Sequence, residues 1–171
     1  MSTSQIDTSK VNSSVGIKIG NEQAPNSLIE FVNLRCPYCK QWWEEKLDLI
    51  SHEVSIGNLH YVIKLFNKTS PSLMLGNVMH QYVPTDGSAI EIITKIYATQ
   101  SEWGNLDSVE EVEAFAESTL GLKKQDNTTM LENIVKETLD ANIRFVPTLI
   151  VDDIDFDQKI SNDDFISLFK H

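Results

Sequence analysis

The sequence has few of the residues that cross-link a protein or anchor it to a membrane. Its two cysteines in 171 residues are too few for a disulfide scaffold or for a four-thiolate zinc site. Lysine and arginine number 14 against 25 aspartates and glutamates, which gives a formal net charge of -11. This charge disfavours nucleic acid and anionic lipid as partners, because both are polyanions. No apolar run approaches the roughly 20 residues that span a bilayer, so we expect no membrane insertion.

The start of the chain lacks the apolar stretch of a signal peptide, since MSTSQIDTSK is mostly polar. Either the protein stays in the cytoplasm, or it is exported and a targeting segment was removed before this chain was defined. We expect the cytoplasm. Residues 1–13 are rich in Ser, Thr and Asn and are predicted to form a flexible tail. We expect a monomer.

Apolar residues are present in sufficient number, at 41% of the chain, to build a real core within one domain. Two stretches, 15–19 and 28–32, read as strands, and the second is apolar enough to be central. A helix is predicted over residues 40–55, and a third strand over 59–66. Strand, helix and strand at this spacing predict a right-handed parallel crossover.

The middle of the chain, residues 67–141, has apolar residues at helical spacing and almost no strand pattern, as in the set Ile90, Ile93 and Tyr97. It is predicted to be an inserted, all-helical subdomain. Strands return at FVPTLIV (145–151) and at IDFD (154–157), and Ser161 can cap a closing helix.

The two cysteines stand in FVNLRCPYCK, with two residues between them. Disulfide exchange needs one thiolate that attacks and a second thiol that resolves the mixed disulfide. Cys36 falls where the strand ends, so the free N–H groups and dipole of the next helix can lower its pKa. Pro37 suits the first helical turn, and Cys39 follows one turn later. We expect Cys36 to be exposed and Cys39 to be buried; the alternative is a chance spacing of two buried cysteines.

Glu30 lies in the middle of the apolar strand LIEFV, where Ile29 and Phe31 take the other face. If both faces of the sheet are covered, Glu30 is buried and its pKa is raised. Such a carboxyl group can accept the proton that Cys39 loses during resolution. The alternative is an edge strand, with Glu30 in water.

The histidines at positions 52, 60 and 80 have no spacing, among themselves or to the cysteines, that predicts a metal site. We expect each to be a surface or partly buried side chain. An iron–sulfur cluster bridging two chains through Cys36 is the remaining metal hypothesis, and we expect no metal.

The order strand, CPYC, helix, strand, helical block, FVPT, strand and helix resembles that of the DsbA-like thioredoxin-fold family of thiol-disulfide oxidoreductases. The resemblance runs from about residue 14 to the C-terminus. It implies an α/β thioredoxin fold, a central mixed sheet flanked by helices, formed by residues 14–66 and 142–171 with the insertion at 67–141. It also implies that Cys36 is the nucleophile, Cys39 the resolving thiol and Glu30 the buried acid.

The resemblance assigns a substrate-binding surface as well. Val146 and Pro147 correspond to the cis-proline loop, where a substrate peptide adds its backbone beside the active site. The dipeptide Pro37-Tyr38 within the motif completes this surface, and it is the dipeptide typical of glutaredoxins. A Gly-Gly pair after the proline, which glutaredoxins carry, is absent. Of Trp42 and Trp43, we expect one to lie in the core and the other to border the active site.

The sequence therefore predicts an enzyme that exchanges disulfides with protein or peptide thiols through Cys36 and Cys39. The cysteine pair is itself the redox group, so no cofactor is expected, and a separate redox partner must recycle the pair. Two alternatives stay open. One is a glutathione-coupled reductase of glutaredoxin type that needs Cys36 alone, and the other is a non-catalytic peptide-binding or holdase module.

Overall fold

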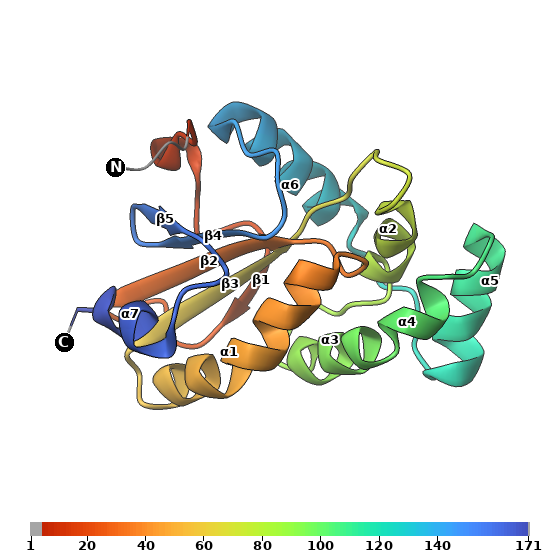
Figure 1. The fold of residues 1–171 in the computed structure, drawn as a ribbon, viewed down its shortest axis with the longest axis horizontal. Helices are drawn as coiled ribbons and strands as arrows, with labels where there is room; N and C mark the ends of the chain where they lie inside the picture. Colours follow the sequence, from red (N-terminus) through yellow and green to blue (C-terminus); the bar gives the residue numbers. More distant parts are fainter. Residues whose placement is uncertain (1–4, 171) are drawn as a thin grey trace.

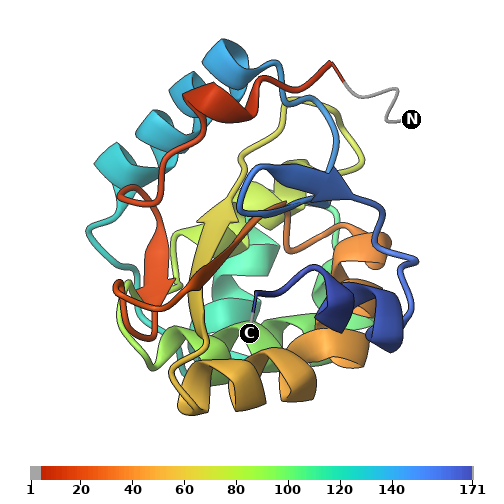
Figure 2. The same ribbon diagram turned by 90° about the vertical axis from the view of Figure 1, so that its left-hand side faces the viewer.

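The predicted strands form one mixed sheet in a computed structural model that describes residues 5–170 (Figures 1 and 2). Its strand order is β1-β3-β2-β4-β5. The two longest strands, β2 and β3, are parallel and lie inside the sheet, as the crossover pattern predicts, and the other pairs are antiparallel. The strands are β1 (Ile17–Ile19), β2 (Asn26–Val32), β3 (Leu59–Leu65), β4 (Thr148–Val151) and β5 (Ile154–Phe156).

Helices cover both faces of the sheet. In Figure 1, α1 and α3 lie below the sheet and α6 lies above it, while α2, α4 and α5 gather at one end. None of the described helices is both long and apolar enough to cross a bilayer. The helices are α1 (Pro37–Ser55), α2 (Met74–His80), α3 (Ala89–Ala98), α4 (Gln100–Trp103), α5 (Val109–Ala114) with a π-helical turn (Phe115–Thr119), α6 (Thr128–Ala141) and α7 (Asn162–Ser167).

The alternation of side chains along β2 distributes them between two cores. Leu28 and Val32 belong to the larger core, which also holds apolar residues of α1 and α3. Ile29 and Phe31 point the other way, into a smaller core with Ile134 of α6. Since both faces are covered, the side chains from Leu28 to Val32 of β2 are all removed from water, whichever face they point to.

Helix α6 is the last helix of the predicted insertion, yet it closes the second face of the sheet. Ile134 and Ala141 of α6 are buried against strand residues of that face. The part of residues 67–141 that stands apart from the sheet therefore ends before α6, because the smaller core needs that helix as its cover.

The prediction of a flexible tail over residues 1–13 is wrong for residues 5–13; residues 1–4 lie outside the described part of the chain. A 3-10 helix (Thr8–Lys10) lies beside α6, and the Asp7 N–H donates to the Ala141 carbonyl at 2.9 Å. The Asn12 N–H donates to Glu137 at 2.8 Å. Polar composition is misleading here, because these residues supply hydrogen bonds to a buried ion pair.

That ion pair joins Lys64 of β3 to Glu137 of α6, with Nζ and Oε1 2.6 Å apart and both side chains buried. The Asn12 carbonyl accepts a further hydrogen bond from Lys64 at 2.7 Å. Burial lowers the pKa of Lys64, and Glu137 opposes the shift. The pair holds the N-terminal segment, the sheet and α6 together.

The FVPTLIV segment differs in part from the prediction of a strand over 145–151. β4 begins only at Thr148, after Pro147. Proline has no N–H to give to the sheet, so the ladder of hydrogen bonds starts after it. Phe145, Val146 and Pro147 form a loop instead.

We predict that Lys64→Met destabilises the fold by about 3–5 kcal/mol, because it leaves the Glu137 carboxylate buried without its cation. The double variant Lys64→Met/Glu137→Leu should recover more than half of that loss, since no lone charge remains. Urea unfolding measures both. Lys170→Met is the control, because its surface contact with Asp152 spans 3.8 Å and such pairs contribute at most about 1 kcal/mol. Equal losses for Lys64→Met and Lys170→Met would contradict this account.

Candidate active site

Cys36 stands at the junction between β2 and α1. It is the N-cap residue of α1, with an extended backbone, and Pro37 occupies the first helical position. The loop before it is closed by the Cys36 N–H, which donates to the Asn33 carbonyl at 2.9 Å. Cys36 therefore lies at the N-terminal end of α1, where the backbone N–H groups have no partner within the helix.

The environment of Cys36 favours a thiolate. A hydrogen bond from the Cys39 thiol lowers the pKa of Cys36 most, and burial opposes it. The N–H groups of Cys39 and Tyr38 and the charge of Arg35 lower it further, so the pKa falls to about 6. At neutral pH most Cys36 is therefore a thiolate, the form that attacks a disulfide.

Cys39 has the opposite environment. Burial raises the pKa of Cys39 well above its usual value, and the hydrogen bond and charge of Cys36 raise it further. The predicted contrast between an acidic first thiol and a protonated second thiol is confirmed. The predicted exposure of Cys36 is wrong, because only 5% of its surface is accessible against 0% for Cys39. The Val146 carbonyl covers it, 3.7 Å from the Cys36 sulfur.

Glu30 is fully buried on β2, between β3 and β4, so the alternative of an edge strand is wrong. Its Oε1 accepts hydrogen bonds from the Trp42 indole N–H, at 3.1 Å, and from the Tyr61 hydroxyl. Burial raises the pKa of Glu30 to about 7, although these two hydrogen bonds oppose the shift. A carboxyl group with that pKa can take or give a proton at neutral pH.

Glu30 and Cys39 are both fully buried, and the charge of Glu30 adds to the raised pKa of Cys39. The second carboxyl oxygen of Glu30, Oε2, has no hydrogen-bond partner among the described residues.

The loop predicted to bind substrate lies directly beside the cysteines. The Val146–Pro147 peptide bond is cis, the geometry that the family resemblance implies. Tyr38, Val146 and Pro147 line a hollow of about 290 Å³, and Phe156 and residues 157–159 complete it. Tyr38 is 58% exposed and Phe145 is also exposed, so aromatic surface borders the hollow.

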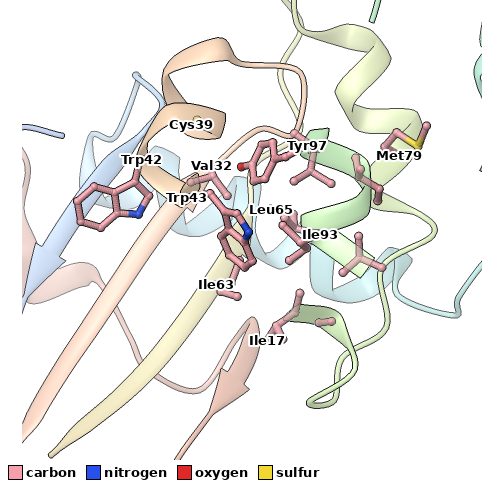
Figure 3. Close-up of a cluster of buried hydrophobic side chains, with 14 of the residues drawn as sticks. Ile17, Val32, Cys39, Trp42, Trp43, Ile63, Leu65, Met79, Ile93 and Tyr97 are labelled. Carbon is pink, nitrogen blue, oxygen red and sulfur yellow. The ribbon is translucent and has the colours of Figure 1, made fainter. Parts of the chain in front are cut away.

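Both tryptophans that follow the motif are buried, but of the two only Trp42 forms a hydrogen bond with Glu30. Trp42 donates to Glu30 and contacts Phe165 of α7, with ring centroids 5.4 Å apart. Trp43 turns toward α3, where it donates to Thr94 at 3.0 Å and contacts the Tyr97 ring. Figure 3 shows Trp42 at one edge of the labelled cluster and Trp43 within it, close to Tyr97.

Three residues of the site escaped the sequence analysis. Tyr61 donates to Glu30, Tyr97 brings a buried hydroxyl with no hydrogen-bond partner in the described part of the chain, and Gln100 donates to the cysteine loop. Tyr61 and Tyr97 look like ordinary core residues in a linear pattern, and Gln100 looks like a surface residue. Their contacts join positions 30 to 70 residues apart, which no local pattern reports.

The expectation of a surface or partly buried histidine is confirmed at position 52 and wrong at positions 60 and 80. His80 is fully buried, and burial lowers its pKa to about 3. Its Nε2 accepts the Leu34 N–H at 3.1 Å, so it holds the cysteine loop as a neutral ring. Within residues 5–170, no three or more His, Cys, Asp and Glu side chains gather in a way that could hold a metal ion.

These features together define a thioredoxin-fold protein: Cys-x-x-Cys at a helix start, a buried acid beneath it, and a cis-proline loop beside it. A family model described as thioredoxin matches residues 12–171, and the chain belongs to that family. No curated protein matches this chain.

Solved structures agree with this assignment. A conserved protein of unknown function from Enterococcus faecalis is 42% identical, with 98% of this chain and 97% of that chain covered and a TM-score of 0.94. A protein-disulfide isomerase from Novosphingobium aromaticivorans is 17% identical, with coverages of 90% and 95% and a TM-score of 0.63.

Alpha-DsbA1 from Wolbachia pipientis is 15% identical, with coverages of 90% and 81% and a TM-score of 0.60. At these low identities, the last two similarities concern the fold. They confirm the predicted DsbA-like thioredoxin fold.

We predict that alkylation of Cys36 in the reduced protein follows a thiolate titration with a midpoint near pH 6, and that Cys39 reacts far more slowly. Cys39→Ala should raise this midpoint, because it removes the hydrogen bond to the Cys36 sulfur. Cys39→Ser is the matched control, since its hydroxyl can still donate. Rates measured by mass spectrometry from pH 4 to 9 test this, and faster labelling of Cys39 would reverse the assignment of the two thiols.

We predict that Glu30→Gln changes how stability depends on pH. The folded state raises the pKa of Glu30 from 4.5 to about 7, so it favours the protonated acid. This contribution is complete below the unfolded pKa and is lost as pH rises through the folded one. Between those values the wild type should lose about 3 kcal/mol relative to Glu30→Gln.

Urea unfolding at pH 5 and pH 8 measures this difference. Glu132→Gln, which removes an exposed carboxylate, is the control and should track the wild type. If the free energies of unfolding of Glu30→Gln and the wild type differ by the same amount at both pH values, the buried acid does not titrate in this range.

Proposed function

We propose that this protein is a thiol-disulfide oxidoreductase that exchanges disulfides with protein or peptide substrates through Cys36-Pro37-Tyr38-Cys39. The opposite pKa shifts of the two thiols carry this proposal. Two cysteines at a chance spacing have no reason to form one acidic and one protonated thiol. The structural similarity to a protein-disulfide isomerase supports the same class of reaction.

In the reducing direction, the Cys36 thiolate attacks one sulfur of a substrate disulfide. The substrate S–S bond breaks, the first substrate sulfur leaves as a thiolate, and a mixed disulfide forms. Cys39 then gives its proton to Glu30 and attacks the Cys36 sulfur. The second substrate thiolate leaves, and two electrons have passed from the cysteine pair, now a disulfide, to the substrate. Oxidation of a substrate dithiol follows the same steps in reverse.

The surface beside the pair suits an extended peptide. The Val146 carbonyl lies next to the Cys36 sulfur, and a peptide backbone that pairs with this loop would bring its own cysteine to Cys36. The neighbouring hollow, lined by Tyr38, Pro147 and Phe156, is of a size for one substrate side chain. Protein and peptide thiols are therefore the proposed substrates.

The cycle needs no bound cofactor, because the electrons reside in the cysteine pair. It needs a second redox partner that restores the pair after each turnover. We keep the cytoplasm as the predicted compartment, with export as the alternative. In the cytoplasm, glutathione and thioredoxin keep thiols reduced, which would keep the pair mainly as a dithiol.

We predict that Cys39→Ser accumulates mixed disulfides between Cys36 and protein substrates and loses disulfide reductase activity, because nothing resolves the intermediate. An insulin-reduction assay and non-reducing gels measure the two effects. A glutaredoxin-type enzyme would instead keep activity of Cys39→Ser on a small glutathione mixed disulfide. A holdase would keep suppressing aggregation when both cysteines are serine. Either result would replace the proposed function.

A further inference from the structure

The helical insertion holds the cysteine loop through one buried amide. Gln100, the first residue of α4, has only 5% of its surface exposed. Its Nε2 donates to the Leu34 carbonyl at 2.8 Å and to the Cys36 carbonyl at 3.1 Å. A residue 64 positions further along the chain thus contacts the backbone of the attacking cysteine itself.

The neighbouring contacts show that this part of the insertion is closely fitted to the loop. The Arg35 Nε–H donates to the Gly104 carbonyl at 3.0 Å. A side chain at Gly104 would collide with Arg35, and one at Gly76 would collide with Asn33. The loop therefore has little freedom to shift, and Gln100 is the contact that reaches Cys36.

The Cys36 carbonyl is where this contact can alter reactivity. It also accepts the Lys40 N–H at 3.1 Å, which is the first hydrogen bond of α1. Its orientation fixes the first helical turn, whose N–H groups meet the Cys36 sulfur. An amide donor on this oxygen also offsets its partial negative charge beside a developing thiolate. Both effects favour the ionised thiol.

We propose that Gln100 is a positioning residue of the redox site: by holding the Leu34 and Cys36 carbonyls, it fixes the start of α1 in the geometry that stabilises the Cys36 thiolate. The helical insertion, and not the thioredoxin unit alone, thereby tunes the redox pair. The inference rests on the proposed function in that Cys36 is taken as the attacking thiol.

Asn127 offers a matched control within the same insertion. It is also a buried amide, and its Nδ2 donates to two backbone carbonyls, those of His80 at 3.0 Å and Val83 at 3.1 Å. Neither carbonyl belongs to the cysteine loop, and the His80 ring contacts that loop at the Leu34 N–H and not at Cys36. Loss of either amide removes two hydrogen bonds from an amide to backbone carbonyls. The two variants should therefore suffer the same type of structural damage and differ in their effect on redox chemistry.

The experiment compares Gln100→Met with Asn127→Leu, which keep size and remove the donors. The acidic and basic groups near Cys36, namely Cys39, Arg35 and Tyr97, are unchanged in both variants. The Cys36 pKa is measured from thiolate absorbance and alkylation rates, and the potential by equilibration with glutathione. Stability is measured by urea unfolding.

We expect Gln100→Met to raise the Cys36 pKa by about one unit. At pH 7 this should make the disulfide about fivefold harder to reduce, since the thiolate stabilises the reduced form. Asn127→Leu should lose stability without a change in either quantity. An unchanged pKa in Gln100→Met, or an equal change in Asn127→Leu, would overturn the inference.

A second measurement needs no variant and covers the case in which Gln100→Met does not fold. In the wild-type protein, the side-chain amide NMR signals of Gln100 should titrate with the midpoint of Cys36, and those of Asn127 should not. If the Gln100 signals do not change as Cys36 titrates, the proposed effect of the Gln100 amide on Cys36 is refuted. A wild type without any acidic thiol would instead refute the proposed function, so the two failures are distinguishable.

Discussion

The hydrogen bond from the Cys39 thiol to the Cys36 sulfur is the interaction on which the rest of the site depends. It is the largest influence on the Cys36 pKa, and it acts against the cost of burying that sulfur. The same bond keeps the proton on Cys39, whose pKa it raises. This contact therefore favours a thiolate at Cys36 and, together with burial, a protonated thiol at Cys39. It exists because the two residues stand one turn apart at the start of α1.

Two buried carboxyl groups, Glu30 on β2 and Glu137 on α6, show how the partner of each group decides what it can do. Glu137 faces the Lys64 ammonium, and this ion pair joins three parts of the fold. Glu30 faces only neutral donors, the Tyr61 hydroxyl and the Trp42 indole. Without a cation, burial dominates and leaves Glu30 able to gain and lose a proton near neutral pH. A lysine beside Glu30 would have kept it permanently ionised.

The helical insertion does more than cover the site, because its side chains contact α1 and the cysteine loop directly. Trp43 and Tyr97 meet across the boundary between α1 and α3 (Figure 3). Both backbone groups of Leu34 are bound by the insertion: its N–H donates to His80, and its carbonyl accepts a hydrogen bond from Gln100. Polar side chains buried at this boundary satisfy backbone groups that a tight strand-to-helix junction leaves unpaired. The junction and the insertion therefore depend on each other.

Local pattern was sufficient to predict the central strands and the start of α1, and it gave the burial of Glu30 as one of two alternatives. A strand shows in its alternation, Pro37 marks a first helical turn, and a lone acid in LIEFV stands out against apolar neighbours. The cis-proline loop was predicted from family resemblance. The apolar pattern of FVPTLIV alone does not reveal that the strand begins only after the proline. Local pattern could not show what residues 5–13 and helix α6 pack against, because their partners are distant in the sequence: Asn12 contacts Glu137, and Ile134 packs in one core with residues of β2.

The sequence by itself determined which reactive groups are present, namely two thiols two residues apart, one acid within an apolar strand and one proline before another. Tertiary structure alone decided how strongly each group reacts. The Cys36 pKa depends on a thiol, two N–H groups and Arg35, and the Glu30 pKa depends on complete burial between two strands. Electrostatic effects of this kind vary with distance and with the exclusion of water. Neither quantity exists until residues far apart in the chain have packed around the site.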